Sequence, residues 1–196
     1  MEIKEIELKE RTLTIFNEVE ESTMATAVEK IVHINQEDEV WKRNVNKTLE
    51  LSGAKIDIST IEMPHIQILL STYGGSVYDG LSLYDAIKNS KTDVDITCFG
   101  KIMSMGIVIL LSAKTRKAYR NTTFMIHELS SIALGKLADM EESIDEAKRI
   151  NRVLFDIIEK ETKITHSWLK DIYNKRKDWF FTAEEALEIG LITEII

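Results

Sequence analysis

Apolar and polar positions along the chain follow two periods, one typical of strands and one typical of helices. Short apolar runs of strand length lie at 13–16, 66–70, 94–99 and 124–126. Between them, apolar side chains recur every three or four residues, as on one face of a helix. Because strand and helix alternate repeatedly, the pattern predicts an α/β fold with a mainly parallel sheet and crossover helices.

The expected elements follow from these periods and from turn and cap residues. Strands are expected at 13–16, 56–61, 66–70, 94–99, 117–119 and 124–126. Helices are expected at 22–34, 41–53, 77–87, 104–113, 137–160, from 167 onward and at 182–190. Ser22 or Thr23 would cap the first helix, and Gly53 would end the second. Thr182 and Glu185 have the spacing of a capping box at the start of the last helix.

Length and composition limit the class of protein. A chain of 196 residues suits one substantial core and is short for two full domains, so a single domain over 1–196 is expected. The formal net charge of -8 argues against binding of nucleic acid, which usually needs a basic patch. The charged start of the sequence lacks the apolar core of a signal peptide, and no apolar run is long enough to span a membrane. We therefore expect a cytoplasmic protein without membrane contacts.

Cys98 is the single cysteine, so no intramolecular disulfide can form. Its apolar surroundings at 94–99 predict a small buried hydrophobe. One cysteine and four scattered histidines supply no paired-ligand spacing, so neither a metal site nor another cofactor is expected.

Ser104 is a candidate nucleophile. It follows a predicted strand and Gly100, and it begins a helix made almost wholly of apolar residues. A hydroxyl at a helix N-terminus lies near free backbone N–H groups, which stabilise developing negative charge. Simple capping of the helix by Ser104 explains the same pattern, because serine is common at this position.

Two further segments fit acyl transfer. His127 ends the predicted strand at 124–126, where a histidine either acts as a base or only satisfies a local hydrogen bond. Gly74 and Gly75 separate a buried strand from a helix, where they either present backbone N–H groups to an oxyanion or form a tight turn. Aspartate and glutamate are too plentiful for the acidic partner to be selected from the residues alone.

In combination, these segments resemble the Clp protease proteolytic subunit family, ClpP. The resemblance is carried by Gly100-Lys101-Ile102-Met103-Ser104-Met105-Gly106, Met125-Ile126-His127, Gly74-Gly75 before a helix, and Lys177-Asp178-Trp179-Phe180-Phe181-Thr182-Ala183. These motifs stand in the family's order at compatible spacing, and the resemblance covers about 13–38 and then 67–196. It implies an α/β fold of the ClpP and crotonase kind, with repeated β-β-α units and a protruding handle helix in the region of about 128–160. Residues 39–65 would be an insertion relative to the family.

The resemblance also implies the roles of individual residues. Ser104 would be the nucleophile of a serine endopeptidase, His127 its general base, and Asp178 the residue that orients the imidazole. The backbone N–H groups of Gly75 and Met105 would form the oxyanion hole. The substrate backbone would add as a strand beside the segment after Gly75.

Assembly and partners are likewise implied by the resemblance. The substrate would be a peptide or an unfolded polypeptide, cleaved inside a homo-oligomer of two stacked seven-membered rings. An AAA+ unfoldase of the Clp ATPase kind would feed the chamber. The peptidase itself would need no cofactor and no metal.

Departures from the family pattern keep a non-enzymatic function open. Ile102-Met103 replaces the family's Ala-Ala before the nucleophile, and Tyr73 replaces its proline before the two glycines. Together with the insertion at 39–65, these changes suit a catalytically weak ring scaffold or regulatory subunit that joins an active homologue. They also suggest a divergent form of the family, phage-encoded or accessory.

A third function comes from a related fold, that of enoyl-CoA hydratases, which uses a similar oxyanion hole for thioester enolates. That chemistry needs no Ser–His–Asp set. It would leave His127 and Asp178 without a role, and an absence of acyl-CoA binding would remove it.

Overall fold

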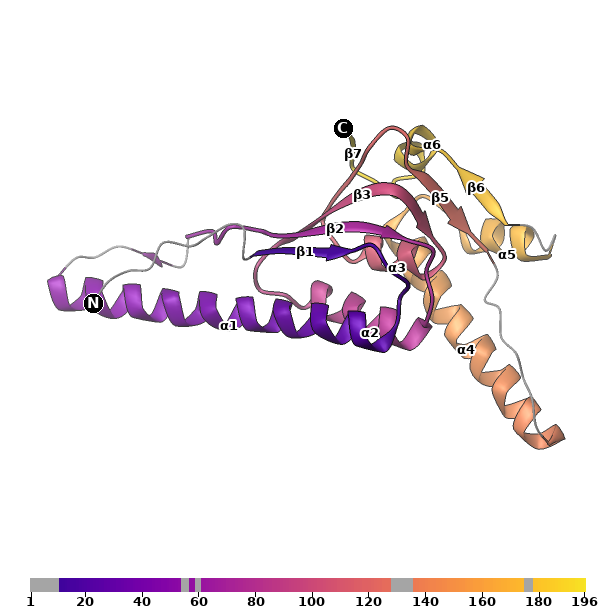
Figure 1. Cartoon of the computed structure of the whole chain (residues 1–196), viewed down its shortest axis with the longest axis horizontal. Coiled ribbons are helices and arrows are strands. Elements are labelled where there is room, and N and C mark those ends of the chain that lie inside the picture. The colour runs from indigo at the N-terminus through magenta and orange to yellow at the C-terminus, as the bar shows by residue number, and fades with distance from the viewer. Residues whose placement is uncertain (1–10, 54–56, 59–60, 128–135, 175–177) are drawn as a thin grey trace.

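The computed structural model describes residues 11–53, 57–58, 61–127, 136–174 and 178–196. Its strands are β1 (Thr12–Ile15), β2 (Ile66–Thr72), β3 (Val94–Met103), β4 (Thr115–Ala118), β5 (Thr123–Ile126), β6 (Trp179–Phe181) and β7 (Glu194–Ile195). Its helices are α1 (Glu21–Ser52), α2 (Val77–Lys88), α3 (Met105–Leu111), α4 (Leu137–Glu161), α5 (His166–Asn174) and α6 (Ala183–Glu188). The predicted alternation of strands and helices is therefore confirmed, and Figure 1 shows its arrangement.

The sheet branches at β3, and this branch positions the end of that strand. β1, β2, β3, β4 and β7 lie side by side in this order, with every pairing parallel. Asp95 to Cys98 of β3 pair with β4, whereas Lys101 to Met103 pair with β5. β6 then pairs with β5 in the antiparallel direction. The far end of β3 therefore lies between β2 and β5, with β6 on the other side of β5.

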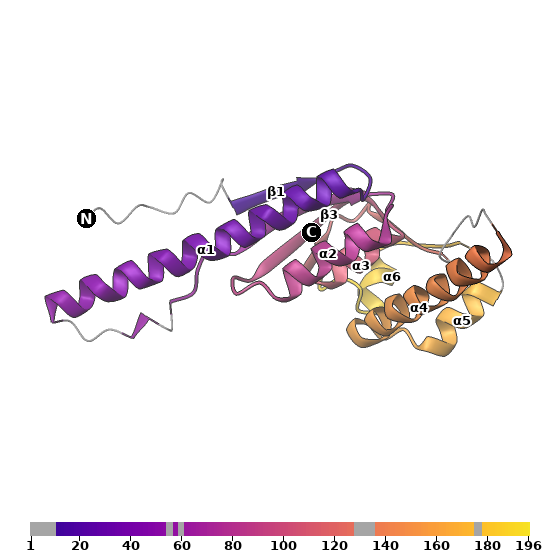
Figure 2. The same ribbon diagram turned by 90° about the horizontal axis from the view of Figure 1, so that it is seen from below.

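The helices cover one face of the sheet. Figure 2 looks onto this helix layer, with α1, α2 and α3 in front of the strands. The side chains of β2 alternate between buried and partly exposed, and those directed into the helix layer are at most 1% exposed: Ile66, Ile68, Leu70 and Thr72. Period-2 alternation is what a strand needs when only one of its faces packs against a core.

Helix α1 corrects the prediction of two helices at 22–34 and 41–53. The helix is continuous, and no glycine or proline interrupts it. Asn35 donates to the backbone oxygen of Ile31, and Asp38 accepts from Arg11, so the polar residues in the middle have partners that are compatible with a helix. Gly53 ends the helix in the left-handed conformation, as predicted.

The N-terminal cap of α1 also differs from the prediction. Glu20, not Ser22 or Thr23, occupies the N-cap position. The two hydroxyls lie inside the first turn and donate to the Glu20 carboxylate instead, at 3.1 and 3.3 Å. A negative charge at this end of a helix is favoured by the helix dipole.

Other expectations had mixed outcomes. The strand predicted at 56–61 is wrong for its described residues, because Asp57, Ile58 and Ile61 lie outside any strand. The capping box is confirmed, with reciprocal hydrogen bonds between Thr182 and Glu185. Residues 1–10, 128–135 and parts of 54–60 lie outside the described residues, so the expectations that fall there stay predictions.

Cys98 is fully buried on the helix-facing side of β3, as predicted. Burial raises the pKa of its thiol, because a thiolate would lose its hydration in the core. The thiol is therefore a packing group.

A buried ion pair connects the middle of α1 to the residue just before β1. The Arg11 guanidinium donates two hydrogen bonds to the Asp38 carboxylate, at 2.8 and 2.7 Å, and both residues are 5% exposed. Thr92, at the turn before β3, also donates to this carboxylate. Arg11 leads into β1, so the one carboxylate joins the starts of two strands to the middle of the helix.

Within the described residues, no helix is long and apolar enough to cross a membrane.

We expect Asp38→Ala to destabilise the fold by about 3–5 kcal/mol, because it leaves the Arg11 guanidinium buried without its counter-charge. The control is Glu39→Ala, the next residue along α1, whose carboxylate and partner Lys91 are both largely exposed. An exposed pair is worth about 0–1 kcal/mol. Chemical denaturation of both variants measures the difference, and equal stabilities would contradict the role given to the buried pair.

Candidate active site

Ser104 lies at the sharp turn between β3 and α3. Its backbone has φ 53° and ψ -123°, and among the described residues it is the one non-glycine residue with positive φ. Its N–H donates to the backbone oxygen of Met125 in β5 at 2.9 Å, which holds the turn in place. A backbone conformation of this kind costs about 1–3 kcal/mol and persists only where the surroundings impose it. A strained serine between strand and helix, with its hydroxyl raised from the surface, is the geometry of a nucleophile elbow.

The Ser104 hydroxyl faces a histidine rather than its own helix. No hydrogen bond links the hydroxyl to the α3 backbone, so simple capping does not account for this serine. His127 Nε2 lies 2.8 Å from Ser104 Oγ. The pairing of Met103 with Met125 brings the ends of β3 and β5 together, and His127 follows directly after β5. A neutral imidazole at this distance can accept the hydroxyl proton, which is the requirement for activating a serine.

Two backbone N–H groups face the space beside Ser104. Val19 N–H donates to the Gly74 oxygen and Ser76 N–H donates to the Val19 oxygen, at 2.8 and 2.7 Å. Gly75, between them, has no hydrogen bond from its N–H to any described residue. Met105 is the first residue of α3, where a helix leaves its N–H groups without intrahelical partners. Both residues line the cavity beside Ser104, so both N–H groups are available to an oxyanion.

Gly74 permits the close approach of this turn to the nucleophile. Its φ is +98°, and a Cβ at this position would lie 2.7 Å from Ser104 Cβ and 2.9 Å from the Met103 oxygen. No side chain fits in that space. The two glycines of the motif therefore have different tasks, since Gly74 provides close contact and Gly75 provides an unpaired donor.

The cavity beside Ser104 and His127 has a volume of about 250 Å³. Its remaining walls are mostly apolar and come from three helices, with Val77 from α2, Val108 from α3, and Leu154 and Ile158 from α4. The interpretation of the sequence missed the two residues from α4, because their helix was assigned only to contacts between rings. Their four-residue spacing put them on one helix face, but the sequence carries no signal that this face reaches the serine.

Asp178 lies opposite His127 when the register of the β5–β6 strand pair is continued. Ile126 pairs with Trp179 in the antiparallel β5–β6 ladder, so continuing the register by one residue puts His127 opposite Asp178. The Asp178 side chain is exposed, and among the described residues no hydrogen bond joins it to His127. The structure thus brings Ser104 and His127 into contact, whereas the position of Asp178 opposite His127 follows from the strand register alone.

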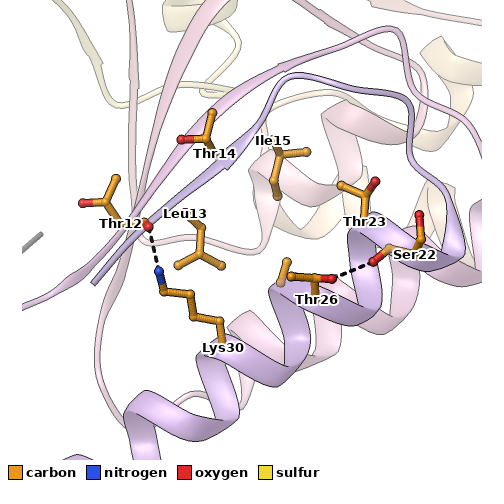
Figure 3. A pocket seen from close by; sticks show the side chains of 9 residues that line it. Thr12, Leu13, Thr14, Ile15, Ser22, Thr23, Thr26 and Lys30 are labelled. Carbon is orange, nitrogen blue, oxygen red and sulfur yellow. Dashed lines mark hydrogen bonds between the residues drawn. The ribbon is translucent and has the colours of Figure 1, made fainter. Parts of the chain in front are cut away.

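A second hollow, of about 480 Å³, lies between β1 and α1 (Figure 3). Hydroxyl groups line it, and Lys30 Nζ crosses it to donate to the backbone oxygen of Thr12 at 3.1 Å. It shares no described residue with the cavity at Ser104. Its one ionisable group is already bonded, so the cavity at Ser104 is the stronger candidate for a catalytic site. In the described part of the chain, no three His, Cys, Asp or Glu side chains form a group that could hold a metal ion.

Comparisons with known proteins agree with this geometry. A family profile described as Clp protease matches residues 56–196. The ATP-dependent Clp protease proteolytic subunit of Deinococcus radiodurans is 35% identical over 133 residues, which are 67% of this chain and 64% of that protein. This chain therefore aligns with somewhat less than two thirds of its relative's length.

The solved structures include a similar fold. A mutant of ClpP1 from Listeria monocytogenes superposes with a TM-score of 0.74, over 96% of this chain and 92% of that one, at 22% sequence identity. At this sequence identity the structural similarity shows the fold alone. It confirms the expected α/β fold of the ClpP kind, a parallel sheet with helices. Because the profile covers most of the sequence, the chain belongs to the Clp protease family.

Proposed function

We propose that this chain is a serine endopeptidase that hydrolyses unfolded polypeptides with Ser104, His127 and Asp178. One observation carries the proposal: the Ser104 hydroxyl, on a strained turn, lies 2.8 Å from His127 Nε2. Two backbone donors that have no partner among the described residues, and an apolar cavity, adjoin it. Membership of the Clp protease family supports the same reaction.

Each step of peptide hydrolysis has a group in place. His127 takes the proton from Ser104 Oγ as this oxygen attacks the peptide carbonyl. The N–H groups of Gly75 and Met105 stabilise the oxyanion that forms, and one such donor is typically worth about 2.7–4 kcal/mol. His127 then gives its proton to the leaving amine. A water molecule, activated by the same imidazole, hydrolyses the acyl enzyme.

Asp178 is proposed to orient His127 and to stabilise its protonated form. The β5–β6 register puts it opposite the histidine, on the side away from the serine strand. We propose that binding of substrate or of a neighbouring copy brings the exposed Asp178 side chain to the imidazole.

The cavity supports a preference for apolar side chains next to the cleaved bond. Val77, Val108, Leu154 and Ile158 offer no charged partner, and about 250 Å³ of space accepts one large aliphatic or aromatic side chain. The substrate backbone would lie beside Gly75, whose other neighbour is Val19. Main-chain hydrogen bonds of this kind read little sequence.

Assembly into two stacked seven-membered rings, fed by an AAA+ Clp ATPase in the cytoplasm, belongs to the same proposal. The first half of α4 projects from the body in Figure 1, and its Ile144 is 48% exposed. An exposed apolar side chain on a projecting helix suits contact with another copy. We also propose a single domain over 1–196, with a handle region at about 128–160 and an insertion at about 39–65.

A ring scaffold or regulatory subunit is the second candidate, and the missing bond between Asp178 and His127 favours it. Such a subunit would join an active homologue and show no hydrolysis alone. Native mass spectrometry with a homologous subunit would detect the mixed rings.

Replacing Ser104 by alanine tests the proposed function directly. We expect Ser104→Ala to lower kcat for a fluorogenic peptide by a factor on the order of 10⁴ to 10⁶, because the nucleophile is lost. The control is Ser82→Ala, which alters an exposed serine of α2 and is expected to keep full activity. Hydrolysis that survives in Ser104→Ala would exclude this serine as the nucleophile.

Asp178→Asn tests the third member of the triad. We expect kcat to fall by a factor on the order of 10² to 10⁴, because the imidazolium loses its counter-charge and its tautomer is no longer fixed. Asp171→Asn, an exposed aspartate of α5, is the matched control. If Asp178→Asn retains the wild-type kcat, another acid orients His127.

Gly74→Ala tests the close approach at the nucleophile. A methyl group there would collide with Ser104 Cβ, so we expect hydrolysis to fall by at least about 10²-fold, as for a misplaced reacting group. Gly53→Ala is the control, because Gly53 also has positive φ but has no atom within 4 Å of the added carbon. Both variants carry the backbone strain, so equal activities would show that the contact with Ser104 is unimportant.

A further inference from the structure

Helix α4 supplies part of the cavity at Ser104, although it lies outside the sheet. Leu154 and Ile158 line the cavity, and Ile150 one turn earlier is buried. These residues are spaced by four, so they share one face of the helix. Glu146 precedes them at the same spacing, on the face directed toward the body of the protein.

Two polar contacts join α4 to α2. At the start of α2, the Tyr78 hydroxyl donates to Glu146 Oε1 at 2.7 Å. At the end of α2, Lys88 Nζ lies 2.9 Å from Glu161 Oε1. The two contacts bracket the stretch of α4 that carries the cavity residues, and their order shows that α2 and α4 run in the same general direction.

The contact at Tyr78 is built around a fixed carboxylate. Arg149, one turn along α4, donates two hydrogen bonds of 2.7 Å to Glu146, which hold its carboxylate toward Tyr78. Hydrogen bonds from Arg149 and then Tyr78 lower the pKa of Glu146 to about 2, so the acceptor stays ionised in ordinary assays. The bond to Glu146 in turn raises the pKa of Tyr78, which keeps the donor protonated.

Tyr78 is also close to the site along the chain. It follows Val77, which lines the cavity, and it is three residues from the donor Gly75. The segment that holds the oxyanion and the helix that walls the cavity are thus linked by one hydroxyl. More than half of the Tyr78 side chain is exposed, so the hydroxyl is not needed to fill the core.

We propose that Tyr78 and Glu146 are positioning residues for substrate binding, whose hydrogen bond links α4 to the start of α2 and keeps Leu154 and Ile158 in the cavity wall. The inference rests on the proposed peptidase function and adds a determinant of its specificity. The pair acts through α4 and touches neither the cleaved bond nor the oxyanion.

Tyr78→Phe removes one oxygen atom and keeps the ring. We expect KM to rise about threefold to tenfold for a peptide with leucine at the cleavage position, while kcat changes less than about twofold, because only substrate binding uses the cavity wall. A peptide with alanine at that position leaves the cavity mostly empty, so its KM should change little. A merely structural role would lower the activity on both peptides alike.

Tyr119→Phe is the control, because it removes the hydroxyl of another half-exposed tyrosine outside the cavity. Glu146→Gln should reproduce the effect of Tyr78→Phe on KM, and the double variant should be no worse than either single one. Effects that simply add would show that the two residues act independently.

Amide hydrogen exchange of 150–158 tests the contact without relying on activity. We expect faster exchange in Tyr78→Phe than in Tyr119→Phe, because α4 opens more often when one of its contacts is lost. If the wild type cleaves through Ser104 but Tyr78→Phe matches the control in KM and in exchange, the inference is overturned and the proposed function stands. If no variant cleaves, the proposed function fails, and unchanged exchange would then overturn the positioning role as well.

Discussion

The backbone of Ser104 is the constraint on which the site depends. A residue with a side chain is held at φ 53° while its N–H is bonded to Met125, and the absence of a side chain at Gly74 leaves the space that Ser104 occupies. The branch of the sheet makes this arrangement possible, since β3 leaves β4 and pairs with β5 just before the serine. The same pairing brings His127 to 2.8 Å from the hydroxyl. The strain in the turn and the contact between Ser104 and His127 therefore have one structural cause.

The cavity beside Ser104 also depends on the helices that form its walls. Its walls combine the start of α2, the first turn of α3 and one face of α4, segments that lie far apart in the sequence. α3 is buried at every residue, so its position is fixed by the core. α4 instead packs at the edge of the molecule and leaves the body along its first half (Figure 1). A cavity with one rigid wall and one peripheral wall can be adjusted through the contacts of the peripheral helix, which is why exposed polar side chains such as Tyr78 matter to it.

Sequence patterns predicted the parts of this arrangement that depend on local chemistry. Short apolar runs located most strands, Gly53 marked a helix end, and Thr182 with Glu185 marked a capping box. The continuity of α1 could not be predicted, because Asn35 and Asp38 are weak helix formers whose partners come from distant segments. β6 was missed because three residues carry too short a pattern, and it exists through pairing with β5 and stacking of Phe124 on Phe181. The strain at Ser104 and the reach of α4 are likewise products of the assembled fold.

The bulky pair before the nucleophile is the departure that most favoured a scaffold function, and its surroundings argue against that function. Ile102 is fully buried and packs near Gly106, where an added Cβ would lie 3.5 Å from its side chain. Met103 pairs with Met125 in the ladder. Neither residue is among those that line the cavity, so the extra volume is absorbed in the sheet and does not fill the space for a substrate. The proposed peptidase function uses Gly74 packed against a strained serine, a Gly75 N–H with no partner among the described residues, and an apolar cavity, whereas a scaffold needs none of them. The pair is thus better explained as a repacked support beneath the candidate site.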